Sequence, residues 1–404
     1  MTKRAAQPLV TVHVTPSLVT LLPVQLRRVQ VLFTLVGVAE ASILPFLPIV
    51  LKDRGLSAAE IGVVLAVAAL AGFVSTPLWG HAADGRLGAE HALVIASIAA
   101  AVAAVPLVLA HSFLALTIVV VLVTAARSAM ASLTDAIALE HLGDDRAQYG
   151  RVRLWLSLGW AISACVWGIV LQTGSLDWLP WIYAACVLVV AFAAYSVDGG
   201  RTVYDRTPKG THRAMLIALA PFLLSLLLLF AAFSATFSFI SIRIRELGGG
   251  LFVVGAATAL QALAEAPVMR ITPRLDRVLG HRALYVLGSL FFIVSFVAWA
   301  FLSNPLAIAL VKLVAGVGFA LVYVGSVLLV DDLVPPALRG TGQGLAKAVT
   351  FGLSPILGSL AGGAIYDYAG PRALFLVCAA AALVAATSVF VIAARDRVTR
   401  VSPT

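Results

Sequence analysis

Long apolar runs alternate with short polar turns along the whole chain. Each run has about 20 residues or more, which is the length needed to cross the hydrocarbon core of a bilayer. Six runs precede a polar stretch and six follow it: 29–51, 60–80, 91–110, 113–138, 154–174 and 177–196, then 214–242, 251–272, 283–303, 305–330, 343–366 and 371–394. The pattern predicts an all-α polytopic membrane protein with 12 transmembrane helices.

The polar stretch divides the chain into two parts of similar length. We expect a cytoplasmic N-terminal tail (1–27), a six-helix bundle (28–197), a cytoplasmic linker (198–213), a second six-helix bundle (214–394) and a cytoplasmic C-terminal tail (395–404). The two parts repeat a motif 192 residues apart, because Asp84 and Gly88 recur as Asp276 and Gly280. Parallel repeats of six helices are typical of a large class of transporters, so we expect the two bundles to be pseudo-symmetric.

The composition indicates a membrane environment. Hydrophobic residues make up 61% of the chain and charged residues only 12%, against roughly 45–50% and about 25% in soluble proteins. These values exclude a soluble enzyme, a disordered chain and a nucleic-acid-binding domain, although the formal net charge is +9. The positive charge is better explained by membrane topology.

Lysine and arginine are distributed unevenly over the predicted loops. With the N-terminus inside, 20 of the 28 basic residues face the cytoplasm, and five face outward: Lys52, Arg54, Arg243, Arg245 and Arg372. Cytoplasmic loops of membrane proteins carry such an excess of basic residues. We therefore predict that both termini are cytoplasmic and that the chain crosses a bacterial-type inner (plasma) membrane.

A short segment between the second and third predicted helices carries a known signature. Residues 80–88, with the sequence GHAADGRLG, resemble the signature loop of the major facilitator superfamily, in which Gly is followed four residues later by Asp and then by basic residues. Gly85 and Glu90 depart from that pattern, because basic residues are common at both positions. Three further stretches are similar to the phenylpropionate-permease-like branch, which neighbours the nucleoside and oligosaccharide proton symporters: 45–48, 149–155 and 265–269.

The resemblance implies a secondary transporter in which two six-helix halves move around a central site. It also implies a cytoplasmic gate held shut by salt bridges between the halves; the alternative is that its charges only set topology. The residues expected at this gate are Gly80, Asp84, Arg86, Arg151 and Arg153.

Several ionisable residues lie inside the apolar runs, where a charge costs at least about 2.5–3.5 kcal/mol. Glu40 and Arg127 fall near the middle of the first and fourth helices, and Glu265 lies just past the middle of the eighth. The third, sixth, ninth and twelfth helices have no ionisable residue in their interiors, so we expect them to face lipid. The other helices are expected to surround one water-accessible chamber in which these three side chains meet.

Each intramembrane charge has a functional and a structural interpretation. Acids inside membranes often carry protons in transporters, which favours Glu265 as a proton site; the alternative is a permanent salt bridge with Arg127 or Lys312. Glu40 is interpreted as a second proton or substrate site, or as half of a structural ion pair. Arg127 keeps its charge, so it either binds an anionic group or pairs with an acid. Asp135 is either a gate charge or a helix cap, and Lys312 can also extend towards the membrane interface.

Helical spacing groups these charges with polar and aromatic side chains. Gln261 and Glu265 share one face of the eighth helix, and Lys312 and Tyr323 share one face of the tenth. Phe233 and Phe237 line a face of the seventh helix, either as cavity wall or as aromatic packing against a neighbour. We include all of them in the predicted proton and substrate cavity.

We therefore predict proton-coupled symport of a small organic solute by alternating access, with an aromatic acid, a sugar or a nucleoside as the solute. The alternatives are proton-driven efflux and a non-transporting receptor or assembly factor of the same fold. No nucleophile-and-base pair, Walker loop or cluster of metal-ligating residues is apparent in the sequence, so we expect no enzymatic activity, metal or cofactor. The expected partners are the solute, protons and the lipid bilayer, with no nucleic acid, and the protein is expected to be a monomer.

Overall fold

The computed structural model describes residues 16–143, 148–197, 212–335 and 338–401, and the regular elements in these ranges are helical. We call the helices before residue 198 the N-terminal group: α1 (Pro16–Ile43), α2 (Leu47–Asp53), α3 (Ala58–Ala82), α4 (Gly88–Ala104), α5 (Phe113–Arg127), α6 (Met130–Leu142), α7 (Tyr149–Thr173) and α8 (Leu179–Tyr195). The helices after residue 211 form the C-terminal group: α9 (His212–Glu246), α10 (Leu251–Leu279), α11 (His281–Phe301), α12 (Pro305–Leu333), α13 (Arg339–Lys347) and α14 (Ser354–Val401).

Eleven helical segments among the described residues are long and apolar enough to cross a membrane. In such segments the backbone amides beyond the first turn are satisfied within their own helix, as a hydrocarbon solvent requires. The last segment, Arg339–Val389, has 51 residues, which exceeds what one crossing needs. It contains a non-helical residue, Gly370, with φ 82° and ψ 172°. The protein is thus an all-helical, multi-pass membrane protein.

Some element ends differ from the sequence-based prediction. Helix α1 begins at Pro16, inside the predicted tail, and α9 begins at His212, inside the predicted linker. Helix α14 continues to Val401, beyond the predicted start of the C-terminal tail. The remainder of the predicted tails and linker, 1–15, 198–211 and 402–404, lies outside the described residues.

Two runs that the sequence predicts as continuous helices are interrupted. The first run breaks between α1 and α2. Pro45 disfavours helical geometry at Leu44 and provides no N–H donor, whereas Pro48 lies in the first turn of α2, where that donor is not needed. The fourth run breaks between Arg127 and Met130. There the carbonyl of Ser128 accepts a hydrogen bond from Thr76 Oγ1 at 3.4 Å, so a neighbouring helix supports the interruption.

Close packing of α1 against α7 depends on two glycines. A Cβ at Gly37 would lie 2.2 Å from the carbonyl oxygen of Leu156, and a Cβ at Gly159 would lie 2.4 Å from that of Thr34. The backbones therefore touch directly, which is how small residues join helices in membranes.

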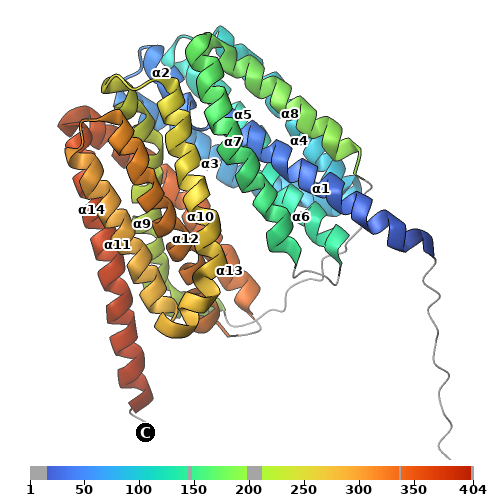
Figure 1. Cartoon of the computed structure of the whole chain (residues 1–404). Helices are drawn as coiled ribbons and strands as arrows, with labels where there is room; N and C mark the ends of the chain where they lie inside the picture. Colours follow the sequence, from blue (N-terminus) through green and yellow to red (C-terminus); the bar gives the residue numbers. More distant parts are fainter. Residues whose placement is uncertain (1–15, 144–147, 198–211, 336–337, 402–404) are drawn as a thin grey trace, which may run out of the picture.

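The two groups lie side by side and converge near α2, while their opposite ends diverge (Figure 1). We call these the α2 end and the terminal end, because the described parts of α1 and α14 begin and finish at the latter. The groups contact each other mainly through α7 with α10 and α3 with α14. Two glycines that the sequence pairs also match in conformation: Gly88 has φ 78° and ψ 158°, and Gly280 has φ 80° and ψ 158°.

Candidate functional site

A buried ion pair lies in the N-terminal group. Arg127 Nη2 is 2.8 Å from Glu40 Oε2, and the two side chains are only 14% and 15% exposed. Arg127 is the last residue of α5, so the interruption of the fourth run directly follows the charged residue. The structure thus brings together two of the three charges that were expected to meet.

Tyr183 of α8 was not predicted as a site residue, because its helix was expected to face lipid. The side chain is fully buried, and its helix packs against α1, which carries Glu40. Its hydroxyl has no hydrogen-bond partner among the described residues. A hydroxyl-bearing side chain within an otherwise apolar run was the signal in the sequence that could have identified it.

A second polar cluster lies in the C-terminal group and joins α10 to α12. Lys312 Nζ donates to Gln261 Oε1 at 3.1 Å, and Gln261 Nε2 donates to Glu265 Oε1 at 3.1 Å. Lys312 is only 3% exposed, although its long side chain is of a kind that often reaches the interface. The Gln261 amide therefore connects a buried amine to a half-buried acid.

Aromatic rings surround the amine of this cluster. Lys312 Nζ lies 5.2 Å from the ring centroid of Phe237 and 5.4 Å from that of Trp299, within the range of cation–π attraction. Phe237 was predicted as a cavity residue. Trp299 belongs to α11, which was expected to face lipid, and sequence reasoning missed it.

Phe233 and Tyr323 join the same region through ring packing. The rings of Phe233 and Phe319 are 5.2 Å apart, and Phe319 stacks on Tyr323 at 5.8 Å. On helix α9, Phe233 therefore packs against other aromatic rings, whereas the ring of Phe237 lies beside the Lys312 amine. The aromatic packing is thus observed at Phe233, and the role of these rings as a cavity wall stays a prediction.

The two clusters are separate among the described residues. No hydrogen bond or ion pair in that part of the chain joins Glu40 or Arg127 to Glu265. Glu265 is therefore not paired with Arg127 there, and it reaches Lys312 only through Gln261. A common chamber for all three charges stays a prediction.

Asp135 pairs with a residue that was predicted at the gate. Arg153 Nη1 lies 2.5 Å from Asp135 Oδ1 and donates to the hydroxyl of Tyr149 at 3.3 Å. This pair links α6 to α7 within the N-terminal group. Asp135 consequently belongs with the residues near the terminal end and not with the Glu40–Arg127 pair.

Two of the other predicted gate residues, Gly80 and Asp84, lie in the signature segment, and Arg151 lies in α7. Gly80 belongs to α3, Asp84 lies in a π-helical turn (Ala83–Leu87), and Arg151 is exposed in the first turn of α7. Within the described ranges neither Asp84 nor Arg151 forms an ion pair, and the side chain of Arg86 lies outside them. The gate salt bridges between the two groups stay a prediction.

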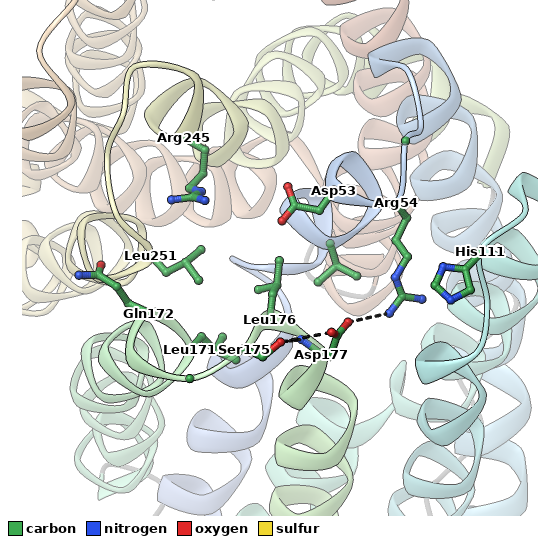
Figure 2. Close-up of a pocket in the computed structure, with 13 residues that line it drawn as sticks. Asp53, Arg54, His111, Leu171, Gln172, Ser175, Leu176, Asp177, Arg245 and Leu251 are labelled. Atoms are coloured by element: carbon green, nitrogen blue, oxygen red, sulfur yellow. Dashed lines mark hydrogen bonds and ion pairs between the residues drawn. The ribbon is translucent and has the colours of Figure 1, made fainter.

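A cavity of about 790 Å³ opens at the α2 end between the two groups (Figure 2). Arg54 donates to the carbonyl oxygens of Leu107, at 2.6 Å, and Ala110 and pairs with Asp177 at 3.4 Å. Arg245 of the C-terminal group faces this pocket from the other side. Sequence reasoning used Arg54 and Arg245 only to count charges.

Over the part of the chain that the structure describes, no cluster of His, Cys, Asp or Glu side chains could hold a metal ion.

The family is shown by a match over most of the chain. Residues 29–377 match the MFS_1 like family. The chain belongs to the major facilitator superfamily. The resemblance inferred from the signature segment is thereby confirmed, and the protein is a transporter and not an enzyme.

Two relatives cover nearly the whole chain. "Maltose permease" of Geobacillus stearothermophilus is 29% identical over 378 residues, which are 90% of this chain and 94% of the relative. "Uncharacterized transporter YwbF" of Bacillus subtilis (strain 168) is 22% identical over 355 residues, 86% of this chain and 87% of the relative.

Solved structures support the same fold. A mutant of the nucleoside transporter NupG superposes with a TM-score of 0.82 at 19% identity, covering 91% of this chain and 99% of that one. A bacterial homologue of the human lysosomal transporter Spinster, in an inward-facing and unoccupied conformation, superposes with a TM-score of 0.69 at 16% identity, covering 95% and 99%. At these identities the likeness concerns the fold alone.

Proposed function

We propose that this transporter is a proton-coupled symporter of a small polyhydroxylated solute, a sugar or a nucleoside, and that it works by alternating access. The names of its relatives support this class of solute, since a maltose permease aligns with 90% of the chain and a nucleoside transporter shares its fold. The aromatic acid that the sequence also suggested has no such support among these relatives.

The topology behind this proposal has 12 spans in two six-helix halves, 28–197 and 214–394. Gly370 divides Arg339–Val389 into two crossings, because its positive φ ends one helix before Pro371 begins the next. The basic residues of the terminal end then face the cytoplasm of a bacterial-type inner membrane. The α2 end is the outer face.

The conformation fits an inward-facing state of such a cycle. The halves converge at the outer end and diverge towards the cytoplasm (Figure 1). Arg153 pairs with Asp135 of its own half, which is consistent with a cytoplasmic gate that is open. An outward-facing state would form those bridges and separate the outer ends.

The hydrogen-bonded chain from the buried Lys312 through Gln261 to the half-buried Glu265 is the observation that supports proton coupling. An ionised Glu265 accepts a hydrogen bond from the Gln261 amide, and its charge balances that of Lys312. A proton on Glu265 neutralises the carboxylate charge that balances Lys312. It also turns a hydrogen-bond acceptor of this side chain into a donor. A solute hydroxyl that hydrogen-bonds to Lys312 or Gln261 is then favoured, so protonation and solute binding support each other.

The N-terminal half supplies the opposite wall. Arg127 stays charged and is neutralised by Glu40, so its remaining guanidinium donors suit hydroxyl or carbonyl groups of a solute. Tyr183 is suited to donate a hydrogen bond beside them. A sugar or nucleoside offers several such acceptors, whereas a simple hydrocarbon offers none.

The test is uptake by purified protein in proteoliposomes, with radiolabelled maltose, uridine and phenylpropionate as probes. We expect an inward proton gradient to drive accumulation of maltose or uridine and a protonophore to abolish it. Glu265→Gln should lose accumulation against a gradient while keeping solute exchange, and Asp53→Asn, which changes an exposed carboxylate, should behave as wild type. Gradient-driven uptake that is unchanged in Glu265→Gln would remove this acid from the mechanism. Proton-driven loss of preloaded solute would instead favour efflux.

A further inference from the structure

We propose that Asp367 and Gln172 are gating residues that hold the outer end closed, each by capping the first turn of a helix in the opposite half. We call these hydrogen bonds the two inter-half caps. The inference rests on the proposed alternating-access function and adds to it the side chains that set the balance between the inward- and outward-facing states.

The first inter-half cap joins α14 to α3. Asp367 Oδ1 accepts a hydrogen bond from the backbone N–H of Ala58 at 3.0 Å. Ala58 begins α3, where the first four N–H groups have no partner inside the helix. The helix already has its own N-cap in Ser57, whose hydroxyl accepts from Glu60 N at 3.1 Å. Asp367 therefore satisfies a different amide, and its negative charge suits a helix N-terminus.

The second inter-half cap joins α7 to α10. Gln172 Oε1 accepts from the backbone N–H of Phe252 at 2.9 Å. The N-cap residue of α10 is Gly250, which has no side chain to serve this purpose. A Cβ at Gly250 would lie 2.1 Å from Gln172 Oε1. The glycine thus removes the helix's own cap and leaves room for one from the other half.

The same backbone approach lies beneath both caps. A Cβ at Gly363 would lie 2.6 Å from the carbonyl oxygen of Ala58, and a Cβ at Gly168 would lie 2.7 Å from that of Leu251. Each capping side chain follows its glycine by four residues, which is about one helical turn. Gly168 and Gly363 are 195 residues apart, three more than the 192 residues that separate the repeated Asp84 and Asp276.

The same glycine-to-cap spacing in both halves indicates that the caps belong to the repeated fold and are not a single chance contact. The glycines bring the helices of opposite halves into contact, and the side chain one turn further out joins them. Both capping residues, Asp367 and Gln172, are exposed at the outer ends of their helices. When the halves separate, water can replace each partner, so the caps are able to break in every cycle.

The test measures the outer-end distance directly, in full-length protein in lipid nanodiscs. Spin labels are placed at His111→Cys and Ser303→Cys, one in each half, in a background in which the three native cysteines are replaced by alanine. Wild type should give one short distance. Asp367→Ala and Gln172→Leu should each increase the outward-open population about threefold or more, as the loss of one hydrogen bond implies, and the double variant should increase it further.

Conservative variants separate capping from other effects. Asp367→Asn and Gln172→Glu keep an acceptor and should open less than Asp367→Ala and Gln172→Leu, and Asp53→Ala on the same face should resemble wild type. Gly250→Ala should open the second cap without altering Gln172, which provides an independent measurement if another variant does not fold. An unchanged distance distribution in the double variant or in Gly250→Ala would overturn the proposal. The readout needs no transport, so distances that shift in a protein that moves no solute would support the caps and refute the proposed function.

Discussion

Arg127 Nη2 lies 2.8 Å from Glu40 Oε2 at a point where both spans are interrupted. Helix α1 ends three residues after Glu40, and α5 ends at Arg127 itself. Interrupted helices in transporters expose backbone groups where a solute or ion binds. The ion pair thus compensates two intramembrane charges and lies where the backbone is least regular.

Removing one member of this pair should destabilise the protein by about 3–5 kcal/mol, because the other charge stays buried without a partner. We expect Arg127→Leu and Glu40→Leu each to lower the unfolding free energy in detergent. The double variant should be more stable than either single variant, since it leaves no unpaired charge. Additive losses in this double-mutant cycle would show that the two side chains do not interact.

Tyr183 and Tyr285 are both fully buried and differ in one respect. The hydroxyl of Tyr285 is 2.9 Å from Ser225 Oγ, whereas that of Tyr183 has no partner among the described residues. Tyr285→Phe should therefore cost about 1 kcal/mol of stability and leave solute affinity unchanged. Tyr183→Phe should leave the melting temperature unchanged and weaken solute binding, measured by thermal shift with maltose and uridine. Equal effects of the two variants would contradict a binding role for Tyr183.

The hydrophobic pattern predicted the membrane fold well because lipid imposes one requirement on every span. The signature segment 80–88 likewise led to the correct superfamily. The break after Arg127 could not be predicted in this way, since hydropathy does not distinguish a continuous helix from two helices end to end. It depends on a tertiary contact, the hydrogen bond from Thr76 to the Ser128 carbonyl.

The candidate site was predicted in part for a similar reason. Charges inside apolar runs identified Glu40, Arg127, Glu265 and Lys312, because such residues need a partner. The sequence did not show which charges pair. Tyr183 and Trp299 were missed because a helix without charges was taken to face lipid on every side. Both helices turn one face inward: Tyr183 is fully buried, and Trp299 lies beside the Lys312 amine.

Variants of Gln261 test whether Glu265 and Lys312 act together in proton coupling. Gln261→Leu should keep the shape of the side chain but disconnect Lys312 from Glu265. We expect proton-driven uptake to be lost, because protonation of Glu265 no longer alters the hydrogen bonds of Lys312. Gln261→Asn, whose amide is too short to reach both groups, should behave in the same way. Full coupling in both variants would show that the acid works without the amine.

Arg54 and Asp177 form an ion pair at the outer end in which the two partners should matter unequally. The side chain of Arg54 is 7% exposed and that of Asp177 is 73% exposed. Arg54 also donates to the carbonyl oxygens of Leu107 and Ala110, which end the third span. Asp177→Asn should therefore change stability by less than about 1 kcal/mol, as exposed ion pairs do. Arg54→Ala should cost about 1–3 kcal/mol, because buried carbonyl groups lose their donors, and Arg54→Lys should restore little of it, since a single ammonium does not reproduce the guanidinium fork. Thermal unfolding of the three variants in one detergent measures these differences in stability. A larger loss in Asp177→Asn than in Arg54→Ala would mean that Arg54 stabilises this end of the protein through the salt bridge and not through the carbonyl contacts.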